Sequence, residues 1–373
     1  MSVDISAIRT NKDLDRFIKL PWQIYKGDKN WVPPLISEER KLLDRGIHPF
    51  HKHAEVEYFL AVKDGKLVGR IAAIVNHRHN EFHNERTGFF GFFECINDQT
   101  VAKTLLDTAE QWLKSKNMGV VRGPCNFSTN ETCGLLVEGF QWQPFIMMTY
   151  NPAYYIDLIT SAGYQKAMDL LAYFILAKEL INEKFKRVAE KITVREAIKI
   201  REINIRNFDK ELETIKYIYN NAWSKNWGFI PMTDEEFYFG AKDMKSILLP
   251  EFAYIAEVNG EPAGFALALP DINHILKKIN GRLFPFGWLY FPLMKRKIPV
   301  LRVVALGIVH KFQYMGIGTL FYLKLIEEAM KRGYKGAELS WVLETNEQMN
   351  KPIRDMGGKP YKVYRIYEKK KTK

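Results

Sequence analysis

The sequence predicts an α/β protein made of two similar halves, each a mixed, twisted sheet flanked by helices. Two hairpins indicate the repeat, because FLAVKDGKLVGRIAAI at 59–74 and YIAEVNGEPAGFALAL at 254–269 align without a gap. A strand–turn–helix pattern over 300–333 supplies the crossover that parallel strands need. With 373 residues, of which 47% are hydrophobic, the chain is long and apolar enough for two cores.

The first half begins with a short strand, followed by helices and a Trp/Pro-rich loop up to residue 50. A hairpin follows over 57–75, with Asp64-Gly65 as its tight turn. The elements expected after it are a strand at 88–93, a helix at 101–116, a strand at 119–123 and a helix that ends at Gly163-Tyr164.

The second half repeats this order. We expect a helix at 209–223, a hairpin at 252–269 that turns at Asn259-Gly260, a buried strand at 300–309, a helix at 319–332 and a strand at 336–343. The charged region 177–195 should join the halves. The domains are therefore expected at 1–180 and 190–373.

The turn at 310–318 points to an anion site. A glycine-containing turn between a strand and a helix directs unpaired backbone N–H groups and the positive end of the helix dipole at one place, which suits a phosphate or pyrophosphate. The two common phosphate motifs are absent. No Lys-Ser/Thr pair follows Gly318, and Phe321 stands where a dinucleotide fingerprint has its third glycine.

The residues Gln313-Tyr314-Met315-Gly316-Ile317-Gly318 resemble the coenzyme A loop of the GNAT acyltransferase superfamily, whose pattern is Gln/Arg-x-x-Gly-x-Gly/Ala. Asn346 and Gly357 also keep the family's spacing. The resemblance implies two tandem GNAT-like domains and an acyl-coenzyme A co-substrate, most simply acetyl-coenzyme A. The coenzyme-binding residues it implies are Leu306, Ile308, Gln313, Tyr314, Met315, Gly316, Ile317, Gly318, Thr319 and Asn346.

The activity that the resemblance implies is N-acyl transfer, most simply N-acetyl transfer, by direct attack of an amine in a ternary complex. This chemistry needs a base for the ammonium proton and a donor for the thiolate. Ile353 stands where many family members have a tyrosine donor, and Gly358 replaces a phenylalanine. The candidate catalytic residues are Glu344 as base, Ser340 as a hydrogen-bonding group, and Tyr361 and Tyr364 as proton donors.

The first half lacks this loop pattern between Phe93 and Val101, so we expect it to have lost coenzyme binding. Two other functions stay open. Protein N-myristoyltransferases and the aminoacyl-tRNA-dependent peptidoglycan bridge enzymes are also tandem GNAT folds, so the donor could be a long-chain acyl group or an aminoacyl-tRNA. The chain could also be a non-catalytic acyl-coenzyme A sensor. The amine acceptor and the oligomeric state are left open.

The formal net charge of +12 favours an acidic ligand, either coenzyme A, a nucleic acid or an anionic membrane surface, and of these a nucleic acid is the least favoured. An insertion at 270–297 contains FPFGWLYFPLMKRK. Aromatic residues beside a basic cluster can lie on a membrane or bind an acyl chain, so 284–297 is a candidate for peripheral lipid contact. The alternative is a lid packed over the sheet.

Other patterns exclude some classes of protein. The N-terminus has no signal sequence and no stretch is apolar enough to span a bilayer, which favours the cytoplasm. Three scattered cysteines do not form a disulfide framework. Six histidines lie between 48 and 83, but no ligand set is complete, and no metal is expected. The polar run 126–131 is either an acceptor site or a turn that satisfies its own backbone.

Overall fold

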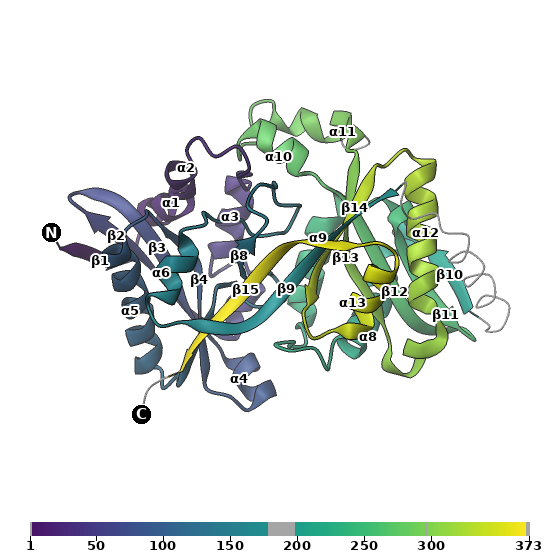
Figure 1. The fold of residues 1–373 in the computed structure, drawn as a ribbon, viewed down its shortest axis with the longest axis horizontal. Helices are drawn as coiled ribbons and strands as arrows, with labels where there is room; N and C mark the ends of the chain where they lie inside the picture. Colours follow the sequence, from purple (N-terminus) through teal and green to yellow (C-terminus); the bar gives the residue numbers. More distant parts are fainter. Residues whose placement is uncertain (1, 178–197, 295–296, 371–373) are drawn as a thin grey trace. The chain divides into compact units, whose positions relative to one another are not determined.

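The computed structural model describes residues 2–177, 198–294 and 297–370, drawn in Figure 1. The chain divides into two compact units, and each is a mixed sheet covered by helices, so the predicted α/β class is confirmed. Unit 1 contains residues 1–170, 276–288 and 362–373, and unit 2 contains residues 171–275 and 289–361.

In unit 1 the strands follow the order β1-β2-β3-β4-β5, antiparallel except for the parallel pair β4–β5. The strands are β1 (Val3–Ala7), β2 (Ala54–Lys63), β3 (Lys66–Asn76), β4 (Thr87–Cys95), β5 (Val120–Gly123), β6 (Cys125–Asn126), β7 (Thr132–Cys133), β8 (Leu135–Glu138) and the beginning of β9 (Gln165–Leu176). The helices are α1 (Asn11–Lys19), α2 (Pro21–Ile24), α3 (Ile36–Leu43), α4 (His77–His83), α5 (Gln99–Ser115) and α6 (Tyr155–Thr160).

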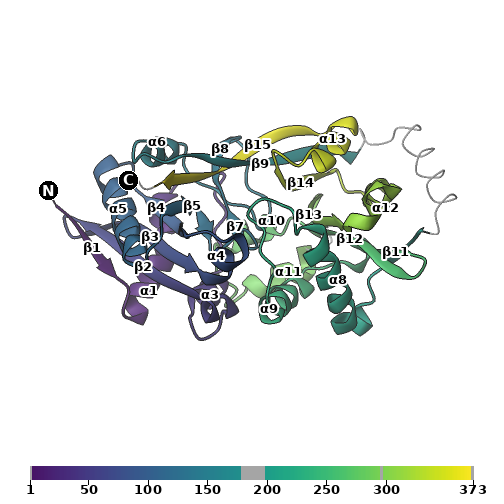
Figure 2. The ribbon, with the colours of Figure 1, turned by 90° about the horizontal axis from the view of Figure 1, so that it is seen from below.

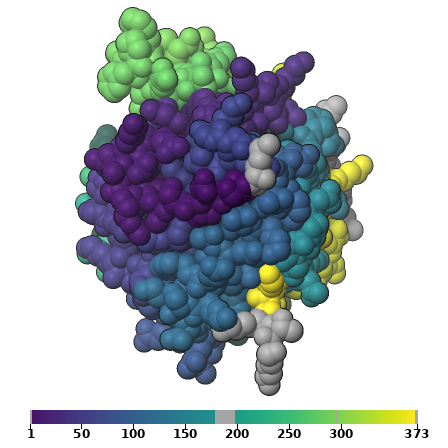
Figure 3. Space-filling model, turned by 90° about the vertical axis from the view of Figure 1, so that its left-hand side faces the viewer, coloured from purple at the N-terminus to yellow at the C-terminus, as the bar shows by residue number. Residues whose placement is uncertain are grey.

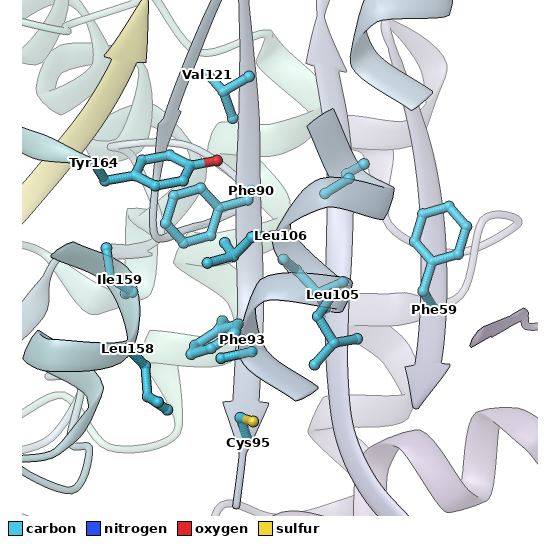
Figure 4. Packing of buried hydrophobic residues seen from close by; sticks show 14 of the residues in the cluster. Phe59, Phe90, Phe93, Cys95, Leu105, Leu106, Val121, Leu158, Ile159 and Tyr164 are labelled. Atoms are coloured by element: carbon cyan, nitrogen blue, oxygen red, sulfur yellow. The ribbon is translucent and has the colours of Figure 1, made fainter. Parts of the chain in front are cut away.

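Helices cover both faces of this sheet, with α5 and α6 on one face and α1 and α3 on the other (Figure 2). Alternate residues of β2 and β3, among them Phe59, Ala61, Ile71, Ala73 and Val75, belong to the core with α5, because successive residues of a strand point to opposite faces. The core between them includes Leu105 and Leu106 of α5 packed near Phe90 and Phe93 of β4 (Figure 4). Burial of this apolar helix stripe holds α5 against the sheet.

In unit 2 the order is β14-β13-β12-β11-β10; β13 and β14 are parallel, and the other neighbours in this order are antiparallel. The strands are β10 (Ile198–Glu202), β11 (Ala253–Val258), β12 (Glu261–Pro270), β13 (Val300–Ile308), β14 (Gly336–Leu343) and the start of β15 (Lys359–Lys370). The helices are α8 (Phe208–Ala222), α9 (Asp234–Lys245), α11 (Tyr290–Met294), α12 (Ile317–Lys331) and α13 (Glu347–Asp355). Helix α10 (Asn273–Ile279) begins in unit 2 and ends in unit 1.

Both predicted hairpin turns are present. Asp64 and Gly65 have φ values of 51° and 73°, and Asn259 and Gly260 have 52° and 83°. Two successive residues with positive φ match the twist of the flanking strands, which is why Asp-Gly and Asn-Gly occupy these positions. The other predicted elements are present with ends shifted by a few residues. They are β4, α5 and β5 in the first half of the sequence, and α8, β13, α12 and β14 in the second.

Each unit includes a strand from the other half of the sequence. The end of β15 pairs with β5 in unit 1, with Tyr367 opposite Gly123. In unit 2 the end of β9 lies beside β14, and Ala177 N–H donates to the Lys335 carbonyl at 2.9 Å. The expected joining region 177–195 lies outside the described residues except for Ala177, so the division at 1–180 and 190–373 stays a prediction.

Candidate functional site

The central strands of unit 2 part at their carboxyl ends. Parallel strands β13 and β14 pair over four residues only, from Val300 opposite Gly336 to Val303 opposite Leu339. Within the described residues, 304–308 and 340–343 do not pair with each other. The carboxyl ends of parallel strands are where α/β sheets place their ligands, and the facing backbone groups here are not used by a β13–β14 ladder.

A one-residue bulge lies just before the exposed edge of β13. Leu267 is opposite Ala305 and Ala268 is opposite Val303, so Val304 is the extra residue. The bulge therefore lies at Val304, and Gly307 pairs in the regular register that follows it. Because a bulge bends its strand and interrupts pairing, it fits the separation of β13 from β14 that begins here.

Gly307 is required by packing. A Cβ at this position would lie 2.0 Å from Cζ3 of Trp223, which ends helix α8. The Trp223 indole stacks on Tyr219, with 4.8 Å between ring centroids, and lies 5.6 Å from the Phe265 ring. Glycine here lets α8 approach the sheet beside the bulged strand.

The turn after β13 presents the N-terminus of α12. The 3₁₀ helix η7 (His310–Met315) leads to Gly316, whose φ of 81° and ψ of 9° are left-handed. Within the described residues no side chain caps α12, and its first backbone bond runs from Leu320 N–H to the Gly316 carbonyl at 3.3 Å. The N–H groups of 317–319 therefore remain for an anion at the positive end of the helix dipole.

A hydrogen-bonded chain ties this turn to α8. Gln313 Nε2 lies 2.9 Å from His310 Nδ1, His310 Nε2 lies 3.1 Å from Ser224 Oγ, and Ser224 Oγ donates to the Asn221 carbonyl at 3.0 Å. With the Gln313 amide as donor, the imidazole is neutral and its Nε2–H donates to Ser224. The Gln313 side chain thus holds the turn, while backbone groups remain available for a ligand.

Sequence reasoning missed His310 and Ser224. The i,i+3 spacing of His310 and Gln313 was a possible signal for the first. Ser224 lies 86 residues away in sequence and carried no signal.

On another side of the turn, the Tyr314 ring is 89% exposed, and its hydroxyl accepts a hydrogen bond from Gln348 of α13 at 3.2 Å.

A buried polar cluster lies where β13 and β14 begin to part. Arg302 and Glu338 are opposite each other in the register, and both are buried with Ser340. Ser340 Oγ donates to Glu338 Oε1 at 2.5 Å, Arg302 Nε donates to Ser340 Oγ at 3.0 Å, and the Tyr361 hydroxyl donates to Glu338 Oε2. The structure therefore brings the candidates Ser340 and Tyr361 together around a carboxylate.

Arg302 and Glu338 were not among the predicted site residues, although each is the single charged residue of a largely apolar strand. Burying a charge without a partner is costly, so an isolated charged residue in such a strand indicates a buried polar contact. That signal could have identified the pair.

The other candidates lie in different surroundings. Glu344 follows β14, and its carbonyl accepts from Asn350 Nδ2 at 3.2 Å. Asn346 caps α13 by accepting the Met349 N–H at 3.2 Å. Tyr364 belongs to unit 1, where it is fully buried and its Cβ lies 3.1 Å from where a Cβ of Gly134 would be.

The other sequence patterns have structural roles in unit 1. Ser128 donates its N–H and its hydroxyl to Glu131 Oε2 at 2.9 and 2.5 Å, so the polar run 126–131 forms a turn that satisfies its own backbone. Burial lowers the pKa of His51 to about 4. Among the described residues no group of three or more His, Cys, Asp or Glu side chains is placed to hold a metal.

In the ranges that the structure describes, no helix combines the length and the apolar character needed to cross a bilayer.

Comparison with known families gives one match, to the Acetyltransferase (GNAT) family over residues 212–357. Two curated proteins are similar over nearly the whole chain. Protein YghO of Escherichia coli (strain K12) is 36% identical, covering 98% of this chain and 95% of the relative. Bacterial ceramide synthase of Caulobacter vibrioides (strain NA1000 / CB15N) is 35% identical, covering 99% and 98%.

Solved structures with low sequence identity share the fold. A tandem GNAT protein from the clavulanic acid biosynthesis pathway matches with a TM-score of 0.59 and 9% identity, covering 99% of this chain and 98% of that one. A GCN5-related N-acetyltransferase from Sphaerobacter thermophilus matches with a TM-score of 0.54 and 13% identity, covering 99% and 95%. The two-unit architecture is therefore that of a tandem protein.

Proposed function

The chain belongs to the GNAT superfamily of acyltransferases, and we propose that it transfers a long-chain acyl group from acyl-coenzyme A to the amino group of a sphingoid base. The observation that carries the acyl and acceptor classes is the 35% identity with bacterial ceramide synthase over nearly the full length of both chains. A ceramide is an N-acylated sphingoid base. An acetyl group, the simplest donor expected from the sequence, is the competing donor.

The turn 313–319 would bind the coenzyme. The N–H groups at the start of α12 would donate to the pyrophosphate, and the helix dipole would add to this attraction. The unpaired edge of β13, near Leu306 and Ile308, offers backbone donors and acceptors to the amides of the pantetheine arm. This arrangement would leave the thioester near the separating strand ends.

The reaction joins the amine nitrogen to the thioester carbonyl carbon and breaks the carbon–sulfur bond. The ammonium proton goes to a base, and the coenzyme thiolate leaves and takes up a proton. We assign the base to Glu344, which follows β14. Tyr361 is the candidate proton donor: its hydroxyl donates to the buried Glu338 here, and it would turn away from that carboxylate to give its proton to the thiolate.

The activity test is product detection by mass spectrometry, with the full chain, a long-chain or an acetyl-coenzyme A, and sphinganine or a panel of other amines. The proposal expects N-acylsphinganine and released coenzyme A, with the long-chain donor preferred. Acetyl transfer to other amines without N-acylsphinganine would contradict it. Tight acyl-coenzyme A binding without turnover on any amine would favour a sensor, and salt-sensitive tRNA binding would favour an aminoacyl-tRNA donor.

The residue roles have a separate test. Glu344→Gln should lower kcat about a hundredfold or more at neutral pH and remove the low-pH limb of the pH profile, where a catalytic base loses activity because it is protonated. Glu347→Gln is the matched control, because Glu347 lies three residues further on and pairs with Arg354 at 2.7 Å. An unchanged pH profile for Glu344→Gln would exclude it as the base. Tyr361→Phe should lower kcat with little change in KM.

A further inference from the structure

We propose that the loop 282–288 attaches this protein to the surface of an anionic lipid bilayer. The loop lies in the insertion between β12 and β13, within the part that belongs to unit 1. Phe284 is 79% exposed and Phe286 is 71% exposed, and Trp288 is also exposed. Large apolar side chains grouped at this exposure mark an interaction surface. The inference goes beyond the proposed function and does not require catalysis.

The base of the loop is fixed to unit 1. Trp22 Nε1 donates to Asn280 Oδ1 at 2.9 Å, and Ile36 N–H donates to the Gly281 carbonyl at 3.0 Å. Gly281 has a φ of 75°, and a Cβ there would lie 2.6 Å from the Pro34 carbonyl oxygen. The light green segment in Figure 3 projects beside the purple N-terminal residues. The aromatic side chains are therefore presented from a fixed support.

Two polar groups of the loop, both of Trp288, are satisfied within it. Trp288 Nε1 donates to the Pro285 carbonyl at 3.1 Å, and Trp288 N–H donates to the Leu283 carbonyl at 2.9 Å. A loop that already pairs such groups loses less when it leaves water, because unpaired polar groups are costly in an apolar medium. The exposure of Phe284 and Phe286 also shows that these side chains do not pack over a sheet, as a lid would require.

The charge of the insertion selects a bilayer as the occupant. The sequence from 272 to 297 contains no Asp or Glu, and its basic residues are Lys277, Lys278, Arg282, Lys295, Arg296 and Lys297. Lys277, Lys278 and Arg282 are exposed. Basic residues beside aromatic ones are the composition of segments that lie in the interface of anionic membranes. At such a surface, the enzyme would meet lipophilic acceptors where they partition.

The test is flotation of the full chain with vesicles of phosphatidylcholine alone, or of phosphatidylcholine mixed with phosphatidylglycerol. The parent protein should float with the anionic vesicles and be released by high salt. The double variant Phe284→Ser/Phe286→Ser should bind about tenfold more weakly, since it loses the inserted rings. Circular dichroism confirms that each variant is folded.

The matched control is Phe82→Ser/Trp142→Ser, which removes two other rings of unit 1 that are 49% and 53% exposed. This variant should float like the parent. Equal flotation of the two double variants, or no flotation of the parent, would overturn the proposal. A parent dimer that becomes monomeric on Phe284→Ser/Phe286→Ser would instead assign the loop to a second copy of the chain.

Discussion

The turn after the central strand differs between the two units, although the strands before it are alike. Strands β4 and β13 each pair with a parallel neighbour over a few residues, and each has a one-residue bulge. Three residues then separate β4 from α5, whereas eight separate β13 from α12. The shorter turn has no room for the glycine-containing 3₁₀ segment of unit 2.

In unit 1 a side-chain carboxylate, that of Asp98, occupies the N-terminus of α5. The Asp98 carboxylate accepts the N–H groups of Thr100 and Val101 at 2.9 and 3.2 Å, and Lys63 Nζ donates to it at 2.5 Å. The hydrogen bond from Lys63 lowers the pKa of Asp98 below its ordinary value. In unit 2 the same position is Gly316, and no side chain in the described part of the chain caps α12. One helix end is filled and the other is open.

The strand edge differs in the same way. In unit 1, a Cβ on Gly91 of β4 would lie 1.8 Å from the Cys125 carbonyl oxygen, and Phe92 N–H donates to Asn126 Oδ1 at 2.6 Å. The chain after β5 thus covers the edge that unit 2 leaves unpaired. The comparison shows how one fold can keep its ligand site in one unit and fill it with its own chain in the other. This supports the expectation that the first half has lost coenzyme binding.

The largest expected effect comes from moving the unit 1 carboxylate into unit 2. Gly316→Asp should weaken acyl-coenzyme A binding on the order of a hundredfold, because a carboxylate close to the pyrophosphate repels it. Gly316→Asn is the control, since it imposes the same left-handed backbone strain without the charge. Calorimetry measures both dissociation constants. Equal affinities for the two variants would place the pyrophosphate elsewhere.

The next largest effect concerns the close approach of α8 to β13, which Gly307 allows because it has no side chain. Gly307→Ala should lower the free energy of unfolding by about 2 to 3 kcal/mol, because its Cβ would overlap the Trp223 ring. Gly240→Ala in α9 is the control, since no described atom outside its own helix lies within 4 Å of that Cβ. It should be neutral or stabilising. Urea unfolding measures both, and similar losses would contradict the packing role.

A smaller effect concerns the pH dependence of stability, to which the buried His51 of unit 1 contributes. Burial holds the pKa of His51 at about 4, below the ordinary 6.5, so the unfolded chain binds more protons between these values. The free energy of unfolding is therefore highest above pH 6.5 and decreases as pH falls towards 4. In His51→Phe, the decrease in the free energy of unfolding between pH 6.5 and pH 4 should be smaller than in the parent by about 1 to 2 kcal/mol.

Urea unfolding at several pH values measures the His51 contribution. The control is His77→Gln, because the His77 side chain is mostly exposed and pairs with Glu55 at 3.1 Å. The control should keep the pH dependence of the parent. If His51→Phe and the parent have parallel pH profiles, another group causes the acid sensitivity.

The smallest effect is expected on removing the Asp98 carboxylate from the N-terminus of α5. Asp98→Ala should lower the free energy of unfolding by about 1 kcal/mol, the usual contribution of an N-cap. Acyl-coenzyme A affinity should not change. Because the pKa of Asp98 is lowered, its contribution is present above the ordinary value of 3.8 and is lost as pH falls through the lowered pKa. Thermal unfolding from pH 7 to pH 3 should show parent and variant converging, and a changed coenzyme affinity would contradict the assignment.

Much of the fold could be predicted because its signals are local. The Asp64-Gly65 and Asn259-Gly260 turns, and the alternation on either side of them, identified both hairpins before any contact was known. The same holds for the turn at 310–318, where short-range spacing of Gln313 and the glycines indicated an anion site. The bulge at Val304 could not be located from the sequence, because an extra residue shows only against a partner strand.

The sequence by itself determined the two hairpins, the strand–turn–helix unit and the residues of the turn, since each depends on periodicity or backbone preferences within a few residues. Tertiary structure alone decided which segments complete each sheet, as in the pairing of β15 with β5, and which distant groups meet, as in His310 with Ser224 and Arg302 with Glu338. These contacts join residues far apart in the chain. Burial and hydrogen-bond satisfaction select them only once the sheets have formed.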